Sequence, residues 1–443
     1  IEDEIPFEIP EGWEWTRLGN LFSTITGNTP STKNASLYGD EYPFYKPTDL
    51  DAGFDVCFSE DTVSEKGYKN GRILPVYSVL VTCIGATIGK TGYIRNSGIC
   101  NQQINAILPN TFILPEYTYF CMCSEFEQQQ IWTNSSATTL PILNKSKFDS
   151  LFFPIPPKAQ QTRTVERIKE LLHFVEIIQQ EKRTLQETIK LTKSKILDLA
   201  IHGKLVPQDP NDEPASVLLE RIRAEKEELI RQGKIKRDKK ESVIFKGDDN
   251  SYYLRTGGVE ESLEDWRFDD LPETWKICCL WELCDYGDCI NVNTEDIAED
   301  AWILDLEDIE KDTGTVLKKV TKAQRNSVST KHKFHSGQVL YSKLRPYLNK
   351  VVLSDADGYC TSEILPLEFK NCVLPEYARY YLMSGTFIAY ANHCSYGVKM
   401  PRLGTTAGEK AIFSLPPLSE QKRIVETIDF CFRQLNKISE ALA

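Results

Sequence analysis

The sequence lacks the patterns that mark several common classes of protein. It contains no apolar run as long as a membrane span, no G-x-G turn for a nucleotide cofactor, and no local motif of a hydrolytic triad, which leaves open a triad assembled in space. An adenine methyltransferase needs Asp or Asn followed by two prolines and an aromatic residue to hold the flipped base, but the two Pro-Pro pairs follow Ile155 and Leu415. These absences predict no membrane association, no cofactor and no catalytic residues in this chain.

Metal-binding and disulfide patterns are also missing. None of the thirteen cysteines forms a C-x-x-C pair, the five histidines are scattered, and Cys279, Cys284 and Cys289 are only loosely clustered. No leader sequence is recognisable, so the cysteines are expected to be free thiols in a reducing cytoplasm. We therefore predict no metal site and a cytoplasmic location.

Composition sets broad limits on the fold and on the partners. The 443 residues suffice for two or three domains, and 41% hydrophobic with 26% charged residues is typical of a globular protein. The formal net charge of -12 argues against a protein that coats nucleic acid regardless of sequence. It still allows local basic surfaces.

A glycine-rich stretch, VTCIGATIGKTGYI at 81–94, ends like a nucleotide-binding P-loop. That loop needs four residues between its glycines so that backbone N–H groups can surround a phosphate, whereas three residues separate Gly85 and Gly89. A helix should also follow the Lys-Thr pair, but Gly92 and the β-forming residues Tyr93 and Ile94 follow it here. A nucleotide-binding hydrolase is therefore the less favoured interpretation.

The chain contains an internal repeat with an offset of 260 residues. PIPPKAQQTRTVERI, which begins at Pro154, matches SLPPLSEQKRIVETI, which begins at Ser414, and ILPEY at 113–117 matches VLPEY at 373–377. The sequence therefore predicts an α+β protein with two similar, strand-rich mixed domains, each followed by a long helix.

The repeat also bears on the glycine-rich stretch. The equivalent segment reads LRPYLNKVV at 344–352, in which only Lys350 matches Lys90 and neither glycine is kept. We expect a tight loop whose side chains differ between the copies, as in two recognition domains with separate targets.

Each copy ends in a helix with an apolar stripe. The residues at helical spacing are Val165, Ile168, Leu172, Val175 and Ile178 in the first copy, and Val425, Ile428, Phe432, Leu435 and Ile438 in the second. The simplest partner of each stripe is the other copy, which predicts an antiparallel coiled coil with pseudo-twofold symmetry between the domains. The alternative is that each helix packs on its own domain. The second helix is expected to be shorter than the first.

Between the copies we expect a turn, a charged helix and an exposed connector. The turn-rich segment is HGKLVPQDPNDEPAS, and the connector is KGDDNSYYLRTGGVEES. The basic residues that end the charged helix either contact DNA phosphates or form a solvated linker: Lys234, Lys236, Arg237, Lys239 and Lys240.

Several segments together carry a family resemblance. They are IPEGWEWTRLGNLF with TGNTPS at 26–31, YPFYKPTDL at 42–50, SKLRPYLNKVV at 342–352, AIHGKLVPQDPNDEPASVLLERI, and the paired PPKAQQTRTVERI and PPLSEQKRIVETI segments. With these segments, which span nearly the whole chain, the protein resembles the specificity subunits of type I restriction-modification systems.

The resemblance implies a non-catalytic subunit with two target recognition domains, each reading one half of a bipartite site in double-stranded DNA. It also implies conserved helices that bind two adenine-methylating (M) subunits and, through them, the restriction (R) subunits. The expected parts are recognition domain 1 at 1–155, a spacer helix and turn at 156–213, the charged helix and connector at 214–261, recognition domain 2 at 262–415, and a second spacer helix at 416–443.

Reading a DNA sequence requires side chains that reach base edges, with Arg or Lys suited to guanine and Asn or Gln to adenine. The first copy offers Thr29, Ser31, Lys33, Lys46, Lys90, Arg95, Asn101, Gln102 and Gln103. The second copy offers Lys331, Lys333, Lys343, Arg345, Lys350, Lys399 and Arg402. A coiled-coil adaptor that does not bind DNA is the other alternative.

Overall fold

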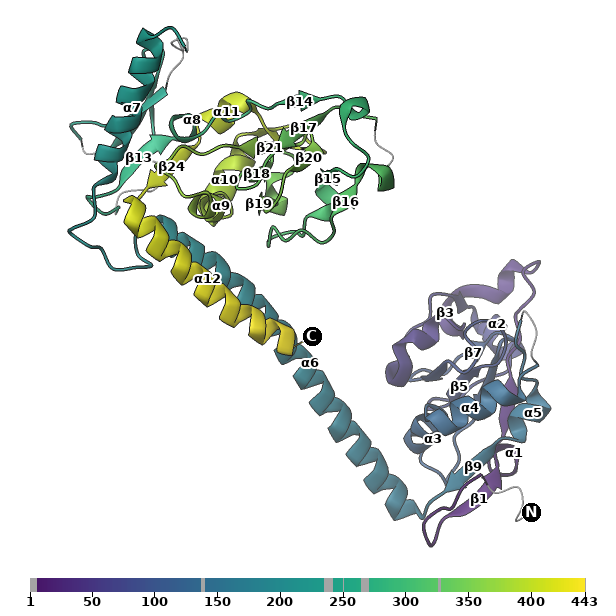
Figure 1. Ribbon diagram of the computed structural model, residues 1–443. Coiled ribbons are helices and arrows are strands. Elements are labelled where there is room, and N and C mark those ends of the chain that lie inside the picture. The colour runs from purple at the N-terminus through teal and green to yellow at the C-terminus, as the bar shows by residue number, and fades with distance from the viewer. Residues whose placement is uncertain are drawn as a thin grey trace. The chain divides into compact units, whose positions relative to one another are not determined.

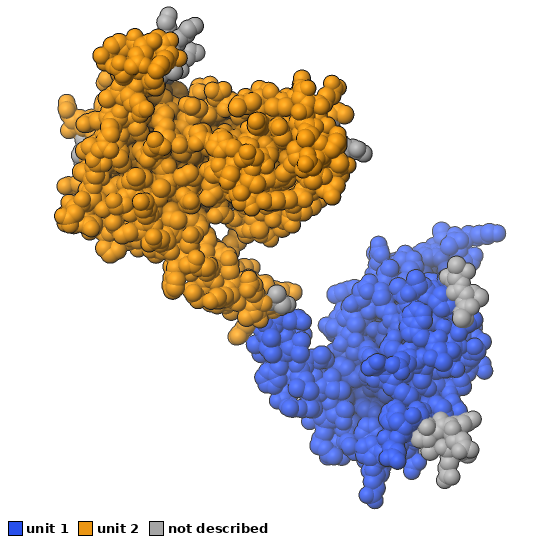
Figure 2. Space-filling model, viewed as in Figure 1, with its two compact units in different colours: residues 1–180 blue, residues 181–443 orange. Residues whose placement is uncertain are grey.

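The computed structural model describes residues 6–136, 140–234, 242–249, 251–263, 271–325 and 328–442. They form two compact units, residues 1–180 and 181–443, which divide within one long helix (Figure 2). Four residues of the predicted basic stretch lie outside the described residues: Lys236, Arg237, Lys239 and Lys240.

Unit 1 is a mixed α+β domain whose two ends are joined, because β1 (Glu14–Arg17) pairs antiparallel with β9 (Phe152–Ile155). An antiparallel sheet has the order β2 (Thr24–Thr26), β8 (Ile104–Ile107), β5 (Val79–Thr82), β6 (Thr91–Tyr93). A second sheet has the order β4 (Thr62–Val63), β3 (Tyr38–Tyr45), β7 (Ile99–Cys100), with β3 and β7 parallel. The helical segments are α1 (Leu18–Leu21), α2 (Glu65–Asn70), α3 (Pro115–Met122), α4 (Glu125–Asn134), α5 (Lys145–Asp149), and short 3-10 turns at Ala35–Leu37 and Asp49–Asp55.

Unit 2 contains an equivalent domain. β13 (Lys276–Cys279) pairs antiparallel with β24 (Ile412–Leu415), and β18 (Val339–Ser342) lies between β19 (Val351–Leu353) and β21 (Ile364–Leu367). A further sheet has the order β14 (Asn291–Val292), β17 (Lys331–Phe334), β20 (Gly358–Thr361), β15 (Trp302–Leu304), β16 (Val320–Thr321). The helical segments are α8 (Leu280–Leu283), α9 (Pro375–Leu382), α10 (Gly385–His393), α11 (Thr405–Glu409), and 3-10 turns at Thr294–Asp296, Leu306–Asp308, Lys322–Gln324 and Pro346–Leu348.

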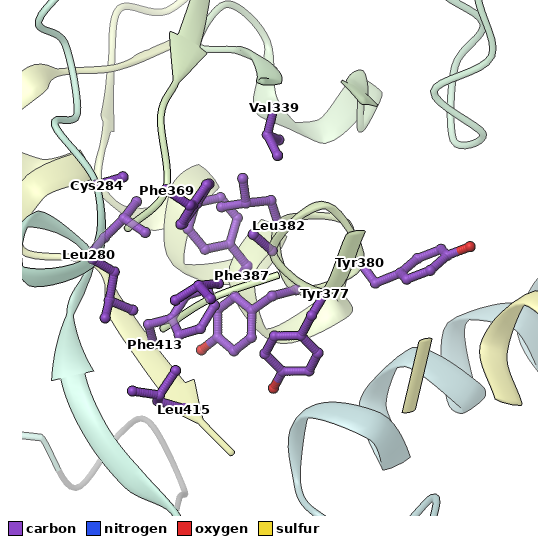
Figure 3. Close-up of a cluster of buried hydrophobic side chains, with 14 of the residues drawn as sticks. Leu280, Cys284, Val339, Phe369, Tyr377, Tyr380, Leu382, Phe387, Phe413 and Leu415 are labelled. Atoms are coloured by element: carbon purple, nitrogen blue, oxygen red, sulfur yellow. The ribbon is translucent and has the colours of Figure 1, made fainter. Parts of the chain in front are cut away.

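Equivalent strands separate equivalent cores in the two units. Residues alternate between the faces of a strand, so Val79 of β5 packs with the cluster around Phe148, whereas Leu80 packs with the cluster around Tyr45. In unit 2, Val339 and Leu340 of β18 are divided in the same way. Figure 3 shows the first of these unit 2 clusters, where the Tyr377 and Phe413 rings meet edge to face with centroids 5.9 Å apart. The predicted repeat and fold class are confirmed.

The connector predicted after the charged helix is folded in the structure. The helix α7 (Ala215–Arg231) is followed by an antiparallel sheet of β10 (Ser242–Lys246), β11 (Tyr252–Thr256) and β12 (Val259–Ser262). Gly257 and Gly258 both have positive φ and make the two-residue turn between β11 and β12. Ile244 and Leu254 pack against Ile277 of β13. The connector is therefore a folded sheet and not an irregular segment, because Ile244 and Leu254 anchor one of its faces, although most of its residues are exposed as expected.

The long helix that ends the first domain is α6 (Lys158–Ile201), and α12 (Leu418–Ala441) packs against its C-terminal half (Figure 1). Ser414 Oγ donates to the carbonyl oxygen of Ile201 at 2.7 Å, and Lys193 Nζ donates to Asn436 Oδ1 at 2.6 Å. The residue numbers run in opposite directions along the two helices, so the pairing is antiparallel, as predicted.

The extent of this pairing differs from the prediction. Val425, Ile428 and Phe432 of α12 pack in the unit 2 core, Leu435 is half-buried and Ile438 is exposed. On α6, Val165 is buried and Ile168 half-buried, but Leu172, Val175 and Ile178 have exposed fractions of 49%, 48% and 66%. The prediction that these three residues are packed within the chain was wrong. The 24 residues of α12 span about 36 Å, which is too short to follow the about 66 Å of the 44-residue α6.

Candidate nucleic-acid interface

In unit 1, the turn between β5 and β6 is joined to a second loop by backbone hydrogen bonds. Gly85 N donates to Pro141 O at 3.0 Å, and Leu143 N donates to Cys83 O at 2.8 Å. Thr82 N also donates to Lys90 O at 2.8 Å, which closes the turn itself. Segments 83–90 and 140–143 are here called the paired loops of unit 1.

Unit 2 has the same arrangement 260 residues later. Arg345 N donates to Pro401 O at 2.7 Å, Leu403 N donates to Lys343 O at 3.0 Å, and Ser342 N donates to Lys350 O at 3.1 Å. The paired loops of unit 2 are segments 343–350 and 395–403, the second of which carries the strands β22 (Ser395–Tyr396) and β23 (Arg402–Leu403) at its ends. The backbone is thus shared while the side chains differ.

The two glycines of GATIGKT stand where the backbone of the turn is left-handed. Gly85 and Gly89 have φ values of 105° and 88°, and the equivalent Arg345 and Asn349 have φ values of 50° and 49°. Left-handed backbone at both positions explains why glycines stand there in unit 1. The strand β6 follows the loop, whereas a P-loop requires a helix at that place. The turn therefore accounts for the motif without a nucleotide.

Arg345 is the notable residue of the unit 2 loops. A left-handed conformation costs a non-glycine residue about 1–2 kcal/mol, and such strain tends to occur at functional sites. The Arg345 Nε is buried and has no hydrogen-bond partner among the described residues, and no described carboxylate forms an ion pair with its guanidinium. A cation held in this way is available to an external acceptor.

Three of the four cations that were predicted to bind DNA in unit 1, all except Lys33, form ion pairs within the unit. Lys46 forms an ion pair with Asp61. Lys90 Nζ lies 2.6 Å from a carboxylate oxygen of Asp51. Arg95 lies 2.7 Å from a carboxylate oxygen of Asp55 and also covers the rings of Phe54 and Tyr93. These pairs leave little net positive charge beside the unit 1 loops.

Comparison with known proteins assigns the family. A family model described as "Type I restriction modification DNA specificity domain" matches residues 10–187 and again residues 272–442. Together the two matches cover more than half of the chain. The chain belongs to this family.

Relatives in this family match along nearly the whole chain. The EcoDI specificity subunit of a type I restriction enzyme from Escherichia coli is 23% identical over 440 residues, which cover 98% of this chain and 84% of that protein. The EcoAI specificity subunit from the same organism is 25% identical, with 99% and 80% covered. The crystal structure of the HsdS subunit from Thermoanaerobacter tengcongensis aligns with a TM-score of 0.57 at 16% identity, over 99% of this chain and 93% of that one. This last likeness shows a shared fold.

The amides predicted in unit 1 differ in accessibility. Asn101 is buried and donates from Nδ2 to Gln103 Oε1 at 2.9 Å, so it holds the Gln103 side chain in place. Thr29 Oγ1 donates to Gln102 Oε1 at 2.5 Å, and both residues are exposed or half-buried. Ser31 and Lys33 are exposed in the segment that follows Thr29.

Three of the basic residues predicted in unit 2 are buried or already bound to other groups of the unit. Lys331 is only 2% exposed and donates to Ser329 Oγ at 2.9 Å, so a duplex could not reach it. Lys350 Nζ donates to Leu306 O at 2.6 Å, and burial lowers the pKa of this lysine. Arg402 makes a two-pronged ion pair with Glu363, with contacts of 3.0 and 2.7 Å. These contacts hold the three side chains within the unit.

The remaining predicted residues of unit 2 are accessible. Lys333 and Lys399 are exposed, Lys343 is half-buried, and none of the three forms an ion pair with a described residue. Sequence reasoning missed the exposed side chains beside them, Tyr347 and Met400. Their position in the repeat, next to Arg345 and Arg402, was the signal that could have revealed them.

Other chemistries find no support in the described part of the chain. No group of three or more His, Cys, Asp or Glu side chains among those residues could hold a metal ion. Among the described helices, none is both long and apolar enough to cross a bilayer. The paired loops, which both units build with equivalent hydrogen bonds, are the candidate functional surface of each unit.

Proposed function

We propose that this chain is the specificity subunit of a type I restriction-modification complex, in which the domain of unit 1 reads one half of a bipartite DNA site and the domain of unit 2 reads the other. The observation that carries the proposal is the pair of loops that each unit holds with the same three backbone hydrogen bonds but different side chains. The two domains share the backbone of these loops, whereas the side chains that could contact bases differ between them. This combination is expected of two duplicated domains that recognise different DNA sequences. The family match to both halves of the chain supports it.

In this proposal the chemistry belongs to other subunits. The sequence has neither a base-holding Pro-Pro motif nor a G-x-G turn, and the EcoDI and EcoAI relatives are named as specificity subunits. Two methyltransferase subunits would bind the spacer helices, and the restriction subunits would join through them.

The uncovered stripe on α6 supports a docking role for that helix. Leu172, Val175 and Ile178 are exposed, whereas Phe432, the α12 residue equivalent to Leu172, packs against the unit 2 core. A continuous exposed apolar face on a helix is typical of a surface that another protein covers, because its burial contributes about 25 cal/mol per Å². We propose that the methyltransferase subunits cover this face.

The experiment adds a type I methyltransferase subunit from the same source to the purified protein, with S-adenosylmethionine and DNA. We expect adenine methylation at one bipartite sequence with both proteins and none with either alone. Methyl transfer by this chain alone, or an unchanged genomic methylation pattern after its deletion, would contradict the proposal.

The docking part is tested by charge insertion on α6. Val175→Glu should abolish co-purification of the methyltransferase subunit. His173→Glu is the matched control, because two residues rotate a side chain by about 200° around the helix and place the new charge on the other side. Equal binding by both variants would contradict docking at this stripe.

A further inference from the structure

The paired loops of the two units differ in charge although they share a backbone. At four equivalent positions, an uncharged residue in unit 1 corresponds to a charged residue in unit 2. The pairs are Cys83 and Lys343, Gly85 and Arg345, Gln103 and Glu363, and Ile142 and Arg402. The hydrogen bonds between the loops are the same in both units, so the difference lies in the side chains alone.

The loops of unit 1 present an amide and apolar side chains. A Cβ atom built on Gly85 would lie 3.8 Å from Gln103 Nε2 and 4.0 Å from Leu140 Cδ1, which places both side chains beside the tip of the turn. Leu140 and Ile142 are exposed there. The Gln103 oxygen accepts from Asn101, while its Nε2 has no hydrogen bond to a described residue. One amide donor therefore faces outward among apolar groups.

Cationic readers are missing from that surface of unit 1. Lys90, in the loop itself, is bound to Asp51, and Arg95 is bound to Asp55. Because bidentate recognition of guanine needs a free guanidinium or ammonium, the described residues of these loops offer no such group. The Gln103 Nε2 donor can bind N7 of adenine or O4 of thymine, although guanine offers acceptors as well. The aliphatic side chains beside it favour an A·T pair, because the thymine methyl group is the apolar contact that this pair presents in the major groove.

The loops of unit 2 present the opposite chemistry. Arg345 has no ion pair with a described carboxylate, and Lys343 and Lys399 add two further cations. Glu363, which stands where unit 1 has Gln103, is neutralised by Arg402. The amide reader is thus replaced by a closed ion pair, while Lys399 is exposed and Lys343 and Arg345 are half-buried. Such cations match the O6 and N7 acceptors of guanine.

We propose that the domain of unit 1 selects an A·T pair through Gln103 with Leu140 and Ile142, and that the domain of unit 2 requires a guanine, which Arg345 reads. This inference rests on the proposed function and adds the base composition of the two half-sites. The two halves of the bipartite site therefore have different chemical character.

The test is the methylation motif produced by the assembled complex of this chain with its methyltransferase subunits, followed by the same measurement on two variants. Arg345→Gly keeps the left-handed backbone and gives unit 2 the residue found in unit 1. It should reduce binding of the cognate duplex about tenfold to a hundredfold and remove the preference for guanine at one position of one half-site. Gln103→Ala should relax an A·T position in the other half-site.

Folding is checked separately. Arg345→Gly should be at least as thermostable as the unchanged protein, because glycine relieves the left-handed strain. Lys311→Ala, an exposed lysine of unit 2 outside the paired loops, is the control and should leave both half-sites unchanged.

The outcomes are separable. A chain-dependent bipartite motif in which Arg345→Gly changes no guanine position, or weakens all duplexes equally, overturns this inference and leaves the proposed function standing. A Gln103→Ala variant that changes the same half-site as Arg345→Gly overturns it as well. Absence of any chain-dependent motif overturns the proposed function itself.

Discussion

Gln161 and Gln421 bind equivalent backbone groups in their own units. In each, the side-chain oxygen accepts from the backbone N–H of a leucine, Leu114 or Leu374, at 2.8 Å. Each side-chain nitrogen donates at 3.0 Å to the carbonyl oxygen of the first proline in the adjacent Pro-Pro pair. Both glutamines are buried. They therefore fasten the start of α6 or α12 to the loop that precedes α3 or α9.

Gln421→Leu should lower the free energy of unfolding of unit 2 by about 2–4 kcal/mol, because buried N–H and C=O groups lose their partners. Chemical denaturation measures the loss, and hydrogen exchange at the Leu374 amide locates it. Gln434→Leu, at an exposed position of the same helix, is the control and should have little effect. Unchanged protection of Leu374 in the Gln421 variant would contradict this role.

Unit 1 should become less stable as pH rises, because of one buried carboxyl group. Glu127 is fully buried in α4, and burial raises the pKa of Glu127 from 4.5 to about 8, although hydrogen bonds with Cys121 and Gln130 oppose the shift. A raised folded-state pKa favours the protonated form. Its stabilising contribution is therefore complete below pH 4.5 and is lost as pH rises through about 8.

Glu127→Gln should remove this pH dependence. The melting temperatures of the variant and the unchanged protein are compared at each pH, so that the effects of other titrating groups cancel. We expect equal melting temperatures near pH 5 and a higher melting temperature for the variant near pH 8.5. Glu125→Gln changes an exposed carboxylate in the same helix and should leave the difference between the two pH values intact. Parallel curves for the Glu127 variant and the unchanged protein would refute the assignment.

The repeat made much of the scaffold predictable. Gln421 follows Gln161 by the same offset that relates the two Pro-Pro pairs, and the apolar periodicity predicted both long helices. The sheet β10–β12 was missed because Gly257 and Gly258 were interpreted as part of a connector, whereas they form a hairpin turn. Turn residues alone do not distinguish a linker from a hairpin, since the outcome depends on whether the flanking residues find a core.

The sequence indicated which segments form the candidate site, but not which of its charged side chains are accessible. Lys90 and Asp51 meet only because the fold brings distant segments together, and no local pattern marks that pair. Lys331 and Lys333 lie two positions apart on β17, yet only Lys331 is buried. Their different burial depends on which other segments pack against each position, and this packing is a tertiary property. The accessible charge of each loop could therefore be read only from the structure.

Gly27→Ala should destabilise unit 1. A Cβ atom on Gly27 would lie 2.0 Å from Asn101 O and 2.4 Å from Cys100 O, and both of these are backbone atoms that cannot move aside alone. We expect a loss of about 1–3 kcal/mol in chemical denaturation, typical of overpacking. Ser31→Ala, on the exposed turn that follows, is the control. A variant as stable as the control would show that the β2 end can shift without cost.

The length of α6 should determine the gap between the two half-sites. Residues 171–180 of this helix are exposed, and α12 packs only on the part that follows, so a short insertion there needs no matching insertion in α12. Four helix-forming residues placed after Gln179 lengthen α6 by about 6 Å, which corresponds to one or two base pairs at about 3.4 Å each. Methylation mapping of the complex should then show both half-sites unchanged and the spacer longer by that amount. Four residues inserted after Pro210, in the turn beyond the end of α6, are the control and should leave the spacer as it was. If the α6 insertion also left the spacer unchanged while methylation persisted, the helix would not set the distance between the half-sites.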